Sequence, residues 1–122
     1  MRTFSIEGDH RAPSIYIDEA KSLVEITGNS VLSETQWFYG NVLKWLIAFN
    51  LGGSRTQTIN IRLEKVNESS SKWIALILSK LSGIISKNNF EINWYLTSNV
   101  NKPAHSAKLI SDLPGFRVNE LV

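Results

Sequence analysis

The segment Asn67-Glu68-Ser69-Ser70-Ser71-Lys72 holds the side chains of this chain that are best suited to chemistry. Serine hydroxyls accept phosphoryl groups from kinases, and a phosphate adds close to two negative charges at neutral pH. Such a charge at a helix start can make or break a docking surface, and Lys72 lies one turn away to meet it. The residue types therefore predict a switchable surface in which Asn67, Ser71 and Lys72 surround a hydroxyl acceptor.

The same residues also fit a purely structural role. Asn67 or Ser69 can cap a helix by accepting backbone N–H groups, and Glu68 then lies near the positive end of the helix dipole. The other serines would fill the first turn. The residue types alone support both interpretations.

Carboxylates and histidines make a weaker case for catalysis. Glu64 and Glu68 define an alternative in which the protein is a small hydrolase or transferase and one of them acts as base. No third group accompanies them, and His10 and His105 lie at opposite ends of the sequence. The chain has no Cys, which excludes a thiolate nucleophile and a Cys-based zinc site. We therefore expect neither an enzyme nor a cofactor.

Two regular elements must position the segment. Residues 58–64 alternate polar and apolar side chains, which predicts a β-strand with the apolar residues on one face. After the segment, apolar residues recur at helical spacing from Ile74 to Leu81, which predicts an amphipathic helix. The segment is thus predicted to form a strand-to-helix corner.

The remaining periodicities predict an α/β protein of one domain over residues 1–122. Strands are expected at 4–6, 15–17, 23–26 (closed by 28–30), 90–96 and 116–118, and helices from Ser33 to a turn at 52–54 and over 103–113. Four aromatic side chains are assigned to the core: Trp37, Trp45, Trp73 and Trp94. This order predicts a mixed sheet with about three helices packed mainly on one face, as in STAS-like sandwiches.

Composition narrows the classes of partner. The 13 basic and 11 acidic residues are scattered and give a net charge of +2, which does not predict a nucleic-acid-binding surface. No apolar run approaches the roughly 20 residues of a membrane-spanning helix, and the N-terminus lacks the apolar stretch of a signal peptide. We expect a cytoplasmic protein with protein partners, without nucleic acid or membrane.

Several stretches, in their order and spacing, resemble the SiaC-type biofilm regulatory phosphoproteins. Segment 67–72 is similar to that family's Asn-Thr-Ser-Ser-x-Lys signature. Four further stretches are similar to its early Thr-Pro-x-Ile, its second strand with a Gly-x-Ser turn, its first helix and its Trp-Tyr strand: Pro13-Ser14-Ile15, Ile26-Thr27-Gly28-Asn29-Ser30, Trp37-Phe38-Tyr39-Gly40-Asn41-Val42-Leu43-Lys44-Trp45 and Asn93-Trp94-Tyr95.

The resemblance implies a STAS-like fold and a partner-switching role. In the family, a dedicated Ser/Thr kinase phosphorylates the threonine of the signature and a phosphatase removes the phosphate. The unphosphorylated form binds and activates a diguanylate cyclase. The resemblance therefore implies a non-enzymatic adaptor in cyclic di-GMP signalling.

Two departures from the family pattern bear on this role. Glu68 stands where the family has its phosphorylated threonine, so either Ser69 or Ser70 is the acceptor, or Glu68 imitates the modified state, or the protein does not switch. A carboxylate carries one charge and two oxygens, so imitation would be partial. Residues 97–108, which match an acidic segment of the family, contain two lysines and no acidic residue.

A second class of regulator remains open at this point. An anti-sigma-factor antagonist with a STAS-like fold would also carry its phosphoacceptor at such a corner, here Ser69 or Ser70. The sequence predicts the same corner for both classes of protein but different partners.

Overall fold

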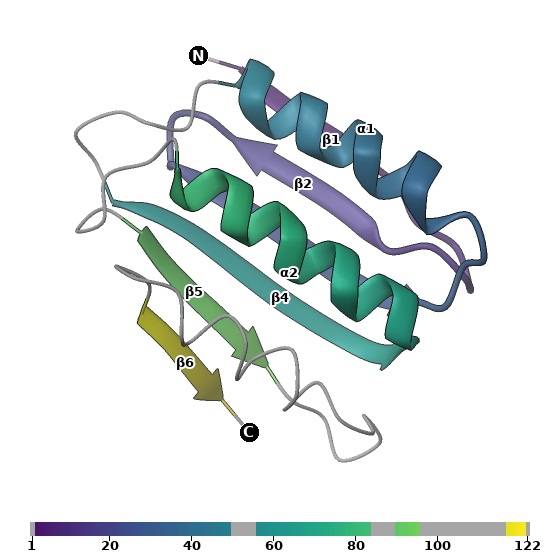
Figure 1. The fold of residues 1–122 in the computed structure, drawn as a ribbon. Coiled ribbons are helices and arrows are strands. Elements are labelled where there is room, and N and C mark those ends of the chain that lie inside the picture. The colour runs from purple at the N-terminus through teal and green to yellow at the C-terminus, as the bar shows by residue number, and fades with distance from the viewer. Residues whose placement is uncertain (1, 50–55, 84–89, 96–116, 122) are drawn as a thin grey trace.

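The computed structural model describes residues 2–49, 56–83, 90–95 and 117–121. These residues form six strands and two helices (Figure 1). In chain order the elements are β1 (Thr3–Ile6), β2 (Ser14–Asp18), β3 (Leu23–Ser30), α1 (Thr35–Ala48), β4 (Gln57–Val66), α2 (Glu68–Ser82), β5 (Phe90–Tyr95) and β6 (Arg117–Leu121). The helix expected over 103–113 and the turn expected at 52–54 lie outside the described residues.

The six strands form one mixed sheet in which spatial order follows sequence order. The pairs β1–β2 and β2–β3 are antiparallel, whereas β3–β4, β4–β5 and β5–β6 are parallel. Parallel neighbours need crossover connections, and right-handed crossovers that advance in one direction place their helices on the same face. Figure 1 shows α1 and α2 side by side on one face of the sheet, as the sequence predicted.

The core lies between this helix layer and the sheet. Alternate residues of the strands point toward the helices because side chains alternate along a strand, and the helices contribute their apolar stripes. The buried set is Ile15, Ile17, Val24, Ile26, Phe38, Tyr39, Val42, Leu46, Phe49, Ile59, Ile61, Leu63, Ile74, Ile77, Leu78, Leu81 and Ile92.

Several boundaries differ from the sequence-based expectation, and two of these differences bear on the corner. Residues 28–30 do not close β3 early, because Asn29 and Ser30 continue the ladder beside β4 after a register shift at Gly28. Gly28 takes a φ of 105°, which a residue without a Cβ adopts readily. Helix α1 begins after Glu34, not Ser33, and the side chain of Glu34 makes no capping hydrogen bond. The strand's extra length brings Ser30 beside Val66, at the start of the corner.

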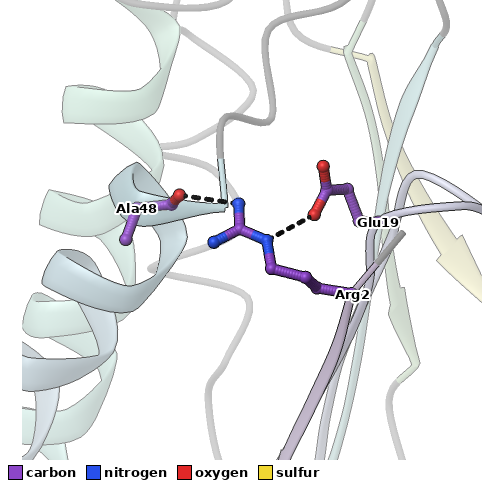
Figure 2. A network of polar contacts seen from close by, with 3 residues as sticks. All are labelled: Arg2, Glu19 and Ala48. Carbon is purple, nitrogen blue, oxygen red and sulfur yellow. Dashed lines mark hydrogen bonds and ion pairs between the residues drawn. The ribbon is translucent and has the colours of Figure 1, made fainter.

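Arg2 holds the opposite end of the helix layer. Its Nε donates to Glu19 Oε2 at 2.9 Å and its Nη2 donates to the Ala48 carbonyl at 3.1 Å (Figure 2). The guanidinium carbon also lies 4.6 Å from the centre of the Phe49 ring. One cation therefore ties the first strand to the C-terminal end of α1.

Candidate functional site

The strand-to-helix corner is built on Asn67, which is the N-cap of α2. Its side-chain oxygen accepts from the Ser70 N–H at 2.8 Å, and its Nδ2 donates to the Leu32 carbonyl at 2.9 Å. Its own N–H donates to the Ser30 carbonyl at 2.9 Å. One asparagine thus caps α2 and fixes it to the segment that leads into α1, so the capping role proposed for Asn67 is confirmed.

A chain of buried hydroxyl groups lies beneath the corner. Ser30 Oγ donates to Ser70 Oγ at 2.8 Å and contacts the Tyr39 hydroxyl at 2.5 Å. Since a serine has one hydroxyl proton and that of Ser30 goes to Ser70, Tyr39 is the donor to Ser30. All three side chains are 0% exposed. Burial raises the pKa of Tyr39 to about 12, so the three buried hydroxyl groups are uncharged at physiological pH.

Two further serines of the segment have different surroundings. Ser69 is exposed, and its Oγ lies 2.5 Å from Thr35 Oγ1 at the first turn of α1. Ser71 is buried, and its N–H donates to the Asn67 carbonyl. Of the two serines named as candidate acceptors, only Ser69 presents its side chain at the surface.

Glu68 and Lys72 form the charged outer side of the corner. Glu68 Oε1 lies 3.4 Å from Lys72 Nζ, and the two side chains are 84% and 74% exposed. Such an exposed pair one helical turn apart contributes little to stability, although a carboxylate at a helix start is favoured by the dipole. Both groups are therefore available to a partner.

The two carboxylates of the enzyme alternative are not brought into one site. Glu64 is exposed and alternates along β4 with Leu63, which points into the core beneath the helices. It therefore projects from the opposite face of the sheet, whereas Glu68 begins a helix of the covered face. His10 is exposed, and His105 lies outside the described residues. Within the described ranges no three metal-ligating side chains gather.

An open groove of about 940 Å³ begins at the corner and lies between the helices. It is lined by Ser33, Glu34, Thr35, Gln36, Trp37, Gly40, Asn41 and Lys44 from the start and outer side of α1, and by Ser69 and Trp73 from α2. The candidate acceptor Ser69 thus borders a surface to which both helices contribute.

The assignment of Trp37 to the core is wrong, because its side chain is 70% exposed in the groove. Trp45 and Trp73 are partly buried and pack against the core, in keeping with their assignment. The side chain of Trp94 is not among those that the structure describes. The sequence pattern around Trp37 already indicates that its side chain is exposed. On a helix, Trp37 shares its stripe with Gly40, Asn41 and Lys44, while the core stripe begins at Phe38.

Sequence reasoning missed Ser30, Thr35 and Tyr39. Each provides a hydroxyl to the corner from an element that is distant in the sequence, and hydroxyls within apolar stretches carry no periodic signal. The parallel pairing of β3 with β4 places the ends of both strands, and the starts of both helices, at one edge of the sheet. This convergence assembles the site.

The geometry defines a small α/β protein with an exposed surface across two helix starts. A family model described as SiaC family regulatory phosphoprotein matches residues 6–113, and the chain belongs to this family. A search of curated proteins found no match. No helix in the described part of the chain is long and apolar enough to cross a bilayer.

Solved structures of the family share the fold. Apo-SiaC from Pseudomonas aeruginosa superimposes with a TM-score of 0.82 at 22% identity, covering 100% of both chains. A second structure of SiaC from the same organism gives 0.77 at 21% identity, with 100% and 98% coverage. A structure of the diguanylate cyclase SiaD in complex with its activator SiaC, also from P. aeruginosa, gives 0.75 at 23% identity, covering 96% of this chain and 98% of that one. The expected α/β fold class is thereby confirmed.

Proposed function

We propose that this protein is a non-enzymatic, cytoplasmic regulator that binds a diguanylate cyclase through the exposed corner residues Glu68, Ser69 and Lys72. Family membership supports the regulatory class, and the solved complex of a relative with a diguanylate cyclase supports the class of partner. The observation that carries the choice of surface is that Glu68 and Lys72 project from the start of α2 and are mostly exposed.

Glu68 does not by itself put the corner in the phosphorylated state, so the protein can bind its partner until another residue is phosphorylated. Its single charge lies 3.4 Å from the ammonium of Lys72, so the net charge of this pair is zero. A phosphate would bring nearly two charges and three acceptor oxygens to the same place, which Lys72 alone would not balance. Glu68 is therefore a weak imitation of a phosphorylated residue.

Ser69 is the position at which a kinase and a phosphatase would act. The Ser70 hydroxyl is 0% exposed and bonded within the buried chain, whereas the Ser69 side chain is exposed at the mouth of the groove. A phosphate on Ser69 would break the contact with Thr35 and place a dianion where the partner binds.

The test uses the purified diguanylate cyclase of the source organism and measures both its binding and its cyclic di-GMP production. Ser69→Asp should lose at least about tenfold in affinity, and Glu68→Gln, which removes one charge of the proposed surface, should weaken binding by a smaller factor. Glu64→Gln is the matched control, because it removes a carboxylate on the other face of the sheet. A cyclase that binds none of these proteins would refute the proposed partner.

The anti-sigma-factor antagonist remains the second candidate because the exposed Ser69 suits it equally well. Mass spectrometry of protein from the native host distinguishes the two. Phosphate on Ser69 together with no cyclase binding would favour the second candidate, and an unmodified Ser69 under all growth conditions would remove the switch from both.

A further inference from the structure

We propose that the groove between α1 and α2 holds one amphipathic helix of the partner, whose docking face carries a base and an acid about three turns apart. The inference rests on the proposed function for the identity of the partner. In this inference the groove adds a binding site for a helix of the partner, which the exposed corner residues alone do not provide.

The walls of the groove favour a helix over a strand. A docking strand needs the unpaired backbone groups of a sheet edge, but the residues that line the groove belong to α1, to the two residues before it and to α2, and none belongs to a strand. Recognition here must use side chains, and a helix presents its side chains along one face at three- and four-residue steps.

The middle of the groove is open and has a tryptophan side chain on each wall. Gly40 contributes no side chain, and a Cβ atom placed there would have no heavy atom within 4 Å. Trp37 stands beside it with 70% of its side chain exposed, and Trp73 lines the facing wall. Tryptophan dominates the energy of many interfaces when a partner covers it. A bulky apolar side chain of the docking helix fits over Gly40, between the two indoles.

Charge sets the register of this helix. Glu34 and Lys44 both line the groove, and neither forms an ion pair with another described residue. They are separated by ten residues along α1, which corresponds to about 15 Å at 1.5 Å per residue. A helix lying along the groove must therefore place a base near Glu34 and an acid near Lys44, about ten or eleven residues apart on one face.

A second copy of this chain fits the groove less well. Two copies related by a two-fold axis would pair Glu34 with Lys44 in both directions, but concave surfaces would face each other and leave the space over Gly40 unfilled. A partner helix is convex and fills it.

The first test blocks the groove. Gly40→Arg fills its centre, and replacing a helical glycine should not weaken α1. Circular dichroism checks the fold. We expect this variant to bind the purified cyclase at least about tenfold more weakly, whereas Ser5→Arg, which adds the same side chain at an exposed site of β1, binds as wild type does. Undiminished binding by Gly40→Arg would overturn the groove while leaving the proposed function intact.

The second test uses synthetic peptides and does not depend on the cyclase. Two helix-stabilised peptides carry leucines along one face, with either Glu and Lys or two Lys at positions three turns apart. The mixed peptide should bind roughly fivefold more tightly, and Lys44→Glu should reverse this preference. Exchanging the two charges within a peptide is no control, because the peptide can turn end for end.

The outcomes separate the possibilities. Equal binding of both peptides would refute the charge register. Peptide binding without cyclase binding would refute the proposed partner but not the groove. A concentration-dependent dimer in sedimentation that Gly40→Arg abolishes would replace the partner helix with a second copy.

Discussion

The two ends of the helix layer are held by different chemistry. At the corner, neutral hydroxyls connect α1, β3 and α2, and the chain Tyr39–Ser30–Ser70 is buried. At the opposite end a cation, Arg2, joins Glu19 to the last carbonyl of α1 (Figure 2). One end is fixed from inside by uncharged groups, and the other is fixed at the surface by an ion pair.

Because of this difference, the fold leaves charged side chains available to a partner at the corner and not at Arg2. At both ends the charges are of the sign that the helix dipole favours, because carboxylates lie at the helix starts and a cation lies at a helix end. The charge of Arg2 is used within the fold. At the corner the hydroxyl chain and Asn67 hold the helices, so Glu34 and Lys44 remain unpaired among the described residues and the Glu68–Lys72 pair stays exposed.

The largest predicted effect separates two adjacent serines of the corner. Ser70→Asp places a carboxylate in a site that is 0% exposed, so we expect a loss of at least about 3 kcal/mol in the free energy of unfolding. Ser69→Asp, at an exposed site near the positive end of α2, should change it by less than about 1 kcal/mol. Urea denaturation measures both. Equal losses would show that the corner is not divided into a buried and an exposed side.

The next prediction concerns the buried hydroxyl chain. Tyr39→Phe keeps the ring and leaves Ser30 without its donor, so it should cost about 1–2 kcal/mol at pH 7. The pKa of Tyr39 is raised from 10.0 to about 12. Between these values the unfolded chain has released the proton and the folded chain has not, so stability falls as pH rises, by an amount on the order of 2 kcal/mol.

Denaturation of both proteins between pH 9 and pH 11.5 isolates this term, because every other titrating group is common to them. The difference in stability between wild type and Tyr39→Phe should shrink across the alkaline range. A difference that stays constant would mean that Tyr39 ionises as freely in the folded chain as in the unfolded one.

The fold was largely predictable because its signals are local. Period-two alternation gave most of β4 and β5, helical spacing gave both described helices, and the consecutive strand–helix order placed the helices on one face. Asn67 was predicted from its residue type as one of two candidate caps, and Ser69, the other candidate, lies within the helix. Trp37 was misassigned because the prediction considered only its apolar side chain. The residues on the same side of the helix were not taken into account.

The site was only half predictable because it depends on contacts that are distant in the sequence. Segment 67–72 was found from its composition, but composition does not distinguish buried Ser70 from exposed Ser69. That distinction comes from Ser30 and Tyr39, which are 40 and 31 residues away in the sequence. The groove likewise needs both helices, and neither helix shows it alone.

The smallest predicted effect belongs to the charged end and has the opposite pH dependence to that of Tyr39. The hydrogen bond from Arg2 lowers the pKa of Glu19 below its usual 4.5. Between the two values the unfolded chain holds the proton and the folded chain does not, so the contribution is complete above the unfolded pKa and is lost as pH falls through the folded one. Exposure of the pair keeps this contribution small.

A double-mutant cycle with Glu19→Gln and Arg2→Met, measured by urea denaturation at pH 7 and pH 3, isolates the pair from Asp18, whose pKa is also lowered. We expect a coupling energy at pH 7 that diminishes at pH 3, since protonation of Glu19 removes the charge that Arg2 faces. The Ser69–Thr35 contact at the corner joins two neutral hydroxyls, so a matching cycle with Ser69→Ala and Thr35→Val should give the same coupling at both pH values. A coupling that falls with pH at the corner and not at Arg2 would reverse the assignment of charged and uncharged ends.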